Sequence, residues 1–146
     1  IAPGCPNLIE RIEGGLMSYG NEFTRANNPF ECGFGPLCHL SSEIDYIGKT
    51  ALQRIANNGP TQRLSGVRFG GGKAPPCSEP FPLTTLDGEE VGQITSGIFS
   101  PRFDCNIGLS MIARSHWDIG TSLLVHTPDG IARRASVAAL PFTHDG

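Results

Sequence analysis

The fold class is decided by the stretch 91-VGQITSGIFSPRFDCNIGLSMIAR-114. Two apolar runs, 91–99 and 106–114, are rich in β-branched residues, and turn-forming residues separate them. Ser100-Pro101 predicts a fixed turn, and Gly97 would allow close approach of another backbone. We therefore expect two paired strands, joined by a loop that is either a structural turn or a contact to a ligand or neighbouring domain.

The same pattern of short apolar segments between Gly, Pro, Asp and Asn turns begins at Thr61 and runs to the C-terminus. Asp87-Gly88 and Asp129-Gly130 each predict a tight hairpin, because Asp-Gly supplies the positive-φ positions that such turns require. Six short strands in succession predict a small barrel or sandwich. The expected strands are RLSGVRF (63–69), PFPLTTL (80–86), VGQITSGIF (91–99), NIGLSMIAR (106–114), SLLVHT (122–127) and IARRASVAAL (131–140).

The first sixty residues have a different texture. A helix is predicted from about Pro6 to Gly14, because apolar residues recur there at helical spacing. A second helix is predicted after Asp45 as its cap, ending at Asn58-Gly59. Its apolar stripe consists of Ile47, Ala51, Leu52 and Ile55.

The segment between these helices is rich in Asn, Gly and Pro, and we expect a loop with one short strand near 37–40. Residues 1–60 contain too little periodic apolar sequence to form a core alone. They are therefore expected to complete a domain that begins upstream, with a boundary near Pro60. The chain starts with Ile1 rather than Met, so we expect it to begin inside a longer gene product.

Composition excludes several classes of protein. The formal net charge of −3 gives no general attraction for nucleic acid or anionic lipid, and no local basic patch is evident. No apolar run approaches the length of about 20 residues that spans a bilayer, so no membrane segment is expected. Five irregularly spaced cysteines argue against a disulfide framework and for a reducing compartment, which predicts a cytoplasmic location.

Metal, nucleophile and phosphate motifs are weak. Cys32, Cys38 and His39 have the wrong spacing for a zinc site and lack a second ligand pair, so no metal is expected. No G-x-S-x-G nucleophile motif occurs. The glycine-rich segment GGGKAPP (70–76) lacks the spacing of a phosphate loop and is expected to connect the first two strands.

Glu13 is the most suggestive polar residue, because it lies among glycines in RIEGG and Tyr19-Gly20 follows it closely. A carboxylate can accept two parallel hydrogen bonds from the ring N–H and exocyclic amine of a pterin. An aromatic ring nearby would cover the flat face of that heterocycle. The alternative is that Glu13 pairs with Arg11 or with a lysine at the surface, and the local sequence leaves both interpretations open.

Several motifs occur in one order along the chain, and together they resemble the second half of the glycine cleavage T-protein superfamily. The resemblance spans essentially the whole chain. Its motifs are R-x-E-x-G (11–15), Y-G-N-E-F (19–23), N-P-F-E-C-G (28–33), D-Y-I-G-K-T-A-L (45–52), R-L-S-G-V (63–67), V-G-Q-I-T-S-G-I-F-S-P (91–101), I-G-L-S-M-I (107–112) and L-P-F (140–142).

This resemblance implies an α+β chain: the end of a ferredoxin-like middle domain over residues 1–60, then a small antiparallel β-barrel over 61–146. It implies tetrahydrofolate as the cofactor, with Glu13 binding the pterin ring and Tyr19 lining the same pocket. Lys49, Arg63 and Arg102 become candidates for contact with the folate tail. The family's N-terminal half, which carries a catalytic or substrate-orienting aspartate, would be the main partner, so the chain alone is expected to be inactive.

Within the superfamily, PNLIERIEGGLMSYGNEF and NNPFECG are more similar to the dimethylsulfoniopropionate demethylase branch than to the aminomethyltransferases. That branch implies transfer of a methyl group from a sulfonium donor to tetrahydrofolate by direct displacement. The alternatives left open are an aminomethyltransferase of the glycine cleavage system, a non-catalytic folate-binding barrel module, and part of a flavin-dependent dimethylglycine or sarcosine oxidase.

Overall fold

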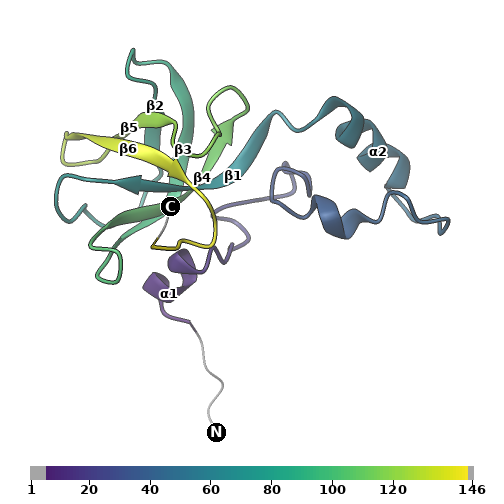
Figure 1. Ribbon diagram of the computed structural model, residues 1–146, viewed down its shortest axis with the longest axis horizontal. Coiled ribbons are helices and arrows are strands. Elements are labelled where there is room, and N and C mark those ends of the chain that lie inside the picture. The colour runs from purple at the N-terminus through teal and green to yellow at the C-terminus, as the bar shows by residue number, and fades with distance from the viewer. Residues whose placement is uncertain (1–5, 145–146) are drawn as a thin grey trace, which may run out of the picture.

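The computed structural model describes residues 6–144, and its main feature is a closed antiparallel barrel (Figure 1). The strands follow one another around the barrel in the order β1-β4-β3-β2-β5-β6. The predicted barrel and all six predicted strands are therefore confirmed. The strands are β1 (Gln62–Phe69), β2 (Phe81–Thr84), β3 (Glu90–Ser100), β4 (Cys105–Ala113), β5 (Ser122–His126) and β6 (Ala132–Ala138).

Alternation of apolar side chains along these strands fills the barrel interior. Both predicted Asp-Gly hairpins are present, one between β2 and β3 and the other between β5 and β6. Gly88 and Gly130 have φ of 92° and 78°, a region that glycine adopts without steric cost. Closure leaves no exposed sheet edge within the barrel. The interior side chains are Val67, Phe69, Phe81, Leu83, Val91, Ile94, Ile112, Leu123, Val125, Ala135 and Val137.

Small residues bring the backbones of β3 and β4 together along a pairing that runs from Gly92–Ile112 to Ser100–Cys105. A Cβ atom at Gly92 would lie 2.2 Å from the carbonyl oxygen of Met111, so only glycine fits there. The close backbone approach predicted at Gly97 lies instead at its partner Gly108, where a Cβ would lie 3.1 Å from the carbonyl oxygen of Ser96 and 2.6 Å from the side chain of Ile94. At Gly97 an added Cβ would make only ordinary contacts, because its face is open toward a cavity described below.

The connection 70–76 between β1 and β2 is held by buried polar side chains. The Asn106 side chain, 1% exposed, donates to the carbonyl oxygen of Gly72 at 2.6 Å and accepts from the amide of Ala74 at 2.9 Å. Buried Arg133 also donates to Gly72, at 3.1 Å, and pairs with Asp129 at 2.7 Å. A segment whose sequence predicts a loop is thus fixed in one conformation by groups from β4 and β6.

Helix α1 (Leu8–Glu13) lies against the barrel (Figure 1). Asn7 and Glu10 form a reciprocal capping box, which explains where this helix begins. Ile12 is fully buried in a second apolar cluster with residues of β4, β6 and the C-terminal segment. The amide of Phe142 donates to the carbonyl oxygen of Glu13 at 2.9 Å, so the chain's last described turn holds the end of α1.

Residues 35–58 form an arm that extends away from the barrel, whereas Glu22 and Glu31 before it bond to barrel strands (Figure 1). Two predictions here are wrong. Residues near 37–40 form no strand, since a 3₁₀ helix, η1 (Gly35–Cys38), occupies this place and Pro36 favours its first turn. Helix α2 (Lys49–Asn58) starts after Gly48 without a side-chain cap, because the carboxylate of Asp45 bonds only to the amide of Tyr46.

Most apolar side chains of the arm face solvent. Ile47 is fully exposed, Ile44 is 75% exposed and Leu37 is 68% exposed, and α2 has no buried residue. An amphipathic helix gains most of its stability by packing its apolar face. Within residues 6–144, these apolar side chains therefore have no surface to pack against.

Candidate functional site

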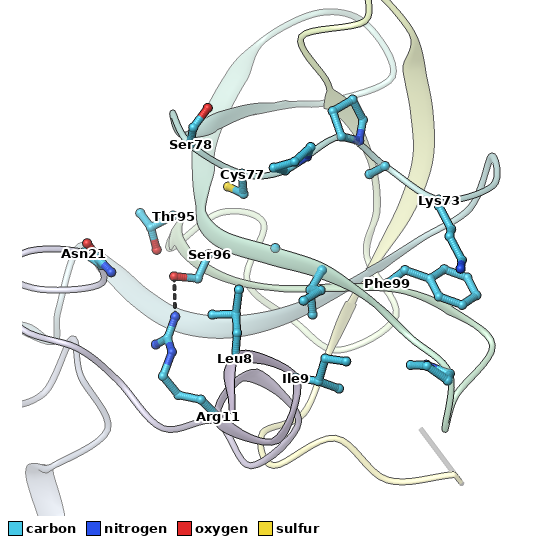
Figure 2. A pocket seen from close by; sticks show the side chains of 16 residues that line it. Leu8, Ile9, Arg11, Asn21, Lys73, Cys77, Ser78, Thr95, Ser96 and Phe99 are labelled. Carbon is cyan, nitrogen blue, oxygen red and sulfur yellow. Dashed lines mark hydrogen bonds between the residues drawn. The ribbon is translucent and has the colours of Figure 1, made fainter. Parts of the chain in front are cut away.

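A cavity of about 610 Å³ lies beside the barrel, and its volume is within the usual range of about 300–1,000 Å³ for small-molecule sites. It lies between α1, β3 and the connection from β1 to β2, as Figure 2 shows. Its lining is mainly apolar with a few polar groups. The lining residues are Leu8, Ile9, Arg11, Asn21, Lys73, Ala74, Pro75, Pro76, Cys77, Ser78, Thr95, Ser96, Gly97, Ile98, Phe99 and Pro101.

The polar side of this cavity is organised by a buried ion pair. The guanidinium of Arg11 donates to Oε2 of Glu22 at 3.0 Å and to Oγ of Ser96 at 2.6 Å, and Figure 2 shows the second bond. The Ser96 hydroxyl donates in turn to Oε1 of Glu22, and the amide of Ser18 donates to Oε2 at 2.6 Å. Every charge in this network therefore has a partner, which buried charges require.

Glu13 lies next to the cavity without lining it. Its Oε1 accepts a 2.6 Å hydrogen bond from Ser100 Oγ, and its Oε2 is 3.9 Å from a guanidinium nitrogen of Arg102. Its side chain is 12% exposed. The suggested pairing with Arg11 is absent, because Arg11 bonds to Glu22 instead. Among residues 6–144, Arg102 is the cation that lies within ion-pair distance of Glu13.

The structure separates the other predicted site residues. Tyr19 is 64% exposed and contacts Phe23 edge to face at 5.6 Å between ring centroids, away from the cavity lining. Lys49 lies in the arm, where its ammonium group donates to backbone carbonyls of Ser42 and Ile44. Arg63 stacks on Trp117 at 4.7 Å. Of the three basic residues considered for a folate tail, only Arg102 adjoins Glu13.

Cys77 is the nucleophilic group in the cavity wall. Burial raises the pKa of its thiol above the ordinary value, so the neutral form dominates near pH 7. Its Sγ lies 3.5 Å from the carbonyl oxygen of Glu79. A mostly neutral thiol in this place lines the cavity as an apolar group rather than as a nucleophile.

Residues 6–144 offer neither a metal-binding cluster nor a membrane-spanning helix. No group of three or more His, Cys, Asp or Glu side chains in that range is arranged to hold a metal ion. No helix in the described part of the chain is long and apolar enough to cross a membrane.

Sequence reasoning missed the roles of Arg11, Glu22 and Ser96. Glu22 belongs to the Y-G-N-E-F motif, and Ser96 belongs to the loop-and-strand segment 91–114, but nothing in their spacing links them. The one signal in the sequence for a buried role of Glu22 is that this charged residue precedes Phe23 in a segment with few other charges. Only packing of α1 on β3 brings the three side chains together.

The class of this protein is a closed antiparallel barrel domain, with a ligand-sized cavity between the barrel and a preceding helix. Residues 63–143 match the model of the glycine cleavage T-protein C-terminal barrel domain. The chain belongs to this family.

Relatives extend the match beyond the barrel. The chain is 50% identical over 131 residues to the dimethylsulfoniopropionate demethylase of Ruegeria pomeroyi, covering 90% of this chain and 35% of that protein. It is 37% identical over 132 residues to an aminomethyltransferase of a Synechococcus strain, again covering 90% of this chain and 35% of the relative. The chain thus spans about a third of the length of the curated relatives it matches.

The fold is also shared with a solved structure. The glycine cleavage system aminomethyltransferase T from Bartonella henselae superposes with a TM-score of 0.77 at 23% identity, covering 92% of this chain and 37% of that chain. Because the match covers 92% of this chain, it extends beyond the barrel into the residues that precede it.

Proposed function

We propose that this chain is the C-terminal part of a tetrahydrofolate-dependent methyltransferase that takes its methyl group from a sulfonium compound such as dimethylsulfoniopropionate. The observation that carries this proposal is the difference in identity between two relatives over the same region. The demethylase shares 50% over 131 residues, whereas the aminomethyltransferase shares 37% over 132 residues. The stretches have nearly equal length, so the difference is one of residues and not of coverage.

The chemistry of Glu13 fits the pterin of tetrahydrofolate. Among residues 6–144, Ser100 occupies one lone pair of Oε1 and Oε2 has the 3.9 Å contact with Arg102, so the carboxylate keeps acceptor sites for two further N–H groups. Glu13 would hold the pterin, and Ser100 and Arg102 would orient Glu13. Tyr19 is proposed as a second pterin contact, since its ring has an exposed surface. Tetrahydrofolate would supply the nitrogen that receives the methyl group.

The rest of the enzyme would come from sequence before this chain. Residues 1–60 would complete a ferredoxin-like α+β domain, with the boundary near Pro60, and the exposed apolar face of the arm supports this division. The partners are then the N-terminal part of the same protein and a small-molecule methyl donor. The free thiols of Cys32, Cys38, Cys77 and Cys105 fit a cytoplasmic enzyme.

Turnover by the full-length protein tests the proposal. Dimethylsulfoniopropionate and reduced tetrahydrofolate are incubated with the enzyme, and the methylated folate and the demethylated thioether are quantified. We expect both products in equal amounts, and neither when the donor or tetrahydrofolate is omitted. Folate binding without methyl transfer from any sulfonium donor would overturn the proposed reaction.

The aminomethyltransferase is the second candidate, supported by the 37% identity over 90% of this chain. A parallel assay with an aminomethyl-lipoyl carrier protein distinguishes the two. Ammonia release and methylenetetrahydrofolate formation with that carrier, together with no turnover of the sulfonium donor, would select this candidate. Binding of tetrahydrofolate with no turnover of either donor would select the non-catalytic barrel module.

A further inference from the structure

Glu22 is a charged residue that the proposed binding chemistry does not use, yet its side chain is completely buried. It lies behind the wall of the large cavity and does not line it. A carboxylate in such a place costs free energy unless it is paired and fully hydrogen-bonded. A buried carboxylate that is paired in this way therefore points to a task that the pair performs for its surroundings.

The partners of the Glu22 carboxylate lie on α1, on β3 and in the segment that follows α1. Oε2 accepts from the Arg11 guanidinium at 3.0 Å and from the amide of Ser18 at 2.6 Å. Oε1 accepts from the hydroxyl of Ser96 and from that of Thr95 at 3.4 Å. Arg11, Thr95 and Ser96 all line the cavity.

The network links α1 to β3 across 85 residues of sequence. Nη1 of Arg11 donates to Glu22 and to the carbonyl oxygen of Leu16, the latter at 2.9 Å. Nη2 of Arg11 donates to Ser96. The guanidinium is thereby fixed in one orientation, because its donors lie in a rigid plane. The Ser96 hydroxyl is fixed as well, since it accepts from Arg11 and donates to Glu22.

We propose that Glu22 is a positioning residue for the cavity between α1 and β3: it sets the orientation of Arg11 and Ser96 and, through α1, the place of Glu13. This inference rests on the proposed function for the identity of the ligand, tetrahydrofolate. Glu22 cannot touch a ligand in the cavity, because its side chain has no exposed surface. Any effect of Glu22 on binding must therefore pass through the residues that it holds.

The test compares Glu22→Gln with Glu90→Gln in the full-length protein. Both substitutions remove one negative charge at constant size, and Glu90 is an exposed residue on the same strand as Ser96. Tetrahydrofolate is titrated calorimetrically at a temperature well below the unfolding midpoint of each variant, so that a loss of stability alone leaves the Kd unchanged. We expect Glu22→Gln to raise the Kd about tenfold or more, and Glu90→Gln to leave it unchanged.

A double-mutant cycle then decides how Glu22 acts. In an Arg11→Gln background, Glu22→Gln should have little further effect on the Kd, because the residue that it positions is already gone. Fully additive effects of the two substitutions, or an unchanged Kd in Glu22→Gln with normal binding by the unsubstituted protein, would overturn the proposal.

Absence of tetrahydrofolate binding by the unsubstituted protein would overturn the proposed function instead. The positioning role is then decided by amide hydrogen exchange. Faster exchange in Glu22→Gln confined to residues 8–22 and 94–100 supports it. Exchange that is unchanged, or that rises evenly across the barrel, overturns it.

Discussion

The hydroxyl of Ser100 donates a 2.6 Å hydrogen bond to Oε1 of Glu13, joining the end of β3 to the end of α1 across 87 residues of sequence. The backbone of Glu13 is held as well, by the amide of Phe142. A carboxylate held at both its backbone and its side chain has a defined orientation before any ligand binds. Preorganisation of this kind favours recognition of a flat, two-point partner.

Glu13→Gln in the full-length protein should weaken tetrahydrofolate binding about tenfold or more, because hydrogen bonds to a charged group contribute about 1.5–3 kcal/mol. The Kd is measured by calorimetry, with Glu90→Gln as the charge-matched control at an exposed site. An unchanged Kd in Glu13→Gln would remove Glu13 from the pterin site.

Ile12→Ala should destabilise the protein by about 2–5 kcal/mol, because Ile12 is fully buried between α1 and the barrel. The free energy of unfolding is measured by urea titration. Ile131→Ala removes the same atoms from a side chain that is 49% exposed in a hairpin turn, and should change stability far less. Equal effects at the two positions would show that α1 does not pack as described.

Ile47→Asp tests whether the arm packs against the part of the protein that precedes this chain. Ile47 is fully exposed here, so within this chain the substitution has no contact to break. In the full-length protein we expect a loss of stability of about 2 kcal/mol or more, since a buried isoleucine would be replaced by a charge. Ile131→Asp is the control. A neutral effect of Ile47→Asp in the full-length protein would contradict packing of this face.

Asp129→Asn tests the hydrogen bonds and ion pair that Asp129 makes with Thr127 and Arg133 at the β5–β6 hairpin. The hydroxyl of Thr127 and the guanidinium of Arg133 hold the pKa of the Asp129 carboxyl below its ordinary value of 3.8. Its ionised form therefore stabilises the fold above that value, and this contribution disappears as the pH falls through the lowered pKa.

The stability difference between the unsubstituted protein and Asp129→Asn should accordingly be constant near neutral pH and shrink below pH 3.8. Unfolding midpoints measured across that range check this. A difference that grows on acidification would contradict the assignment.

Cys77 reports on the cavity. Burial raises the pKa of its thiol, so alkylation should be slow at neutral pH and should accelerate with a midpoint above 9.0. Because Cys77 lines the cavity, a ligand bound there should slow its alkylation. Peptide mass spectrometry quantifies modification at each cysteine separately, and Cys105, outside this cavity lining, serves as the internal reference. Equal protection of both cysteines would point to a general change in stability.

The barrel could be predicted from the sequence because its signals are local. Alternation within each strand and Asp-Gly at residues 87–88 and 129–130 suffice to place strands and hairpins. The arm was harder to predict. Gly48 rather than Asp45 precedes α2, and Pro36 begins a 3₁₀ turn where a strand was expected, because in a segment with few packing contacts small local preferences decide the backbone.

The sequence by itself determined the six strands, helix α1 and the family, since periodicity, turn residues and ordered motifs are properties of neighbouring residues. Only the tertiary structure decided that Glu13 bonds to Ser100 and that Arg11 bonds to Glu22 and Ser96. The physical reason is that the sequence offers each polar side chain many candidate hydrogen-bond and ion-pair partners. Burial of Ile12 against the barrel fixes where α1 lies, and that position selects which partners come within hydrogen-bond distance.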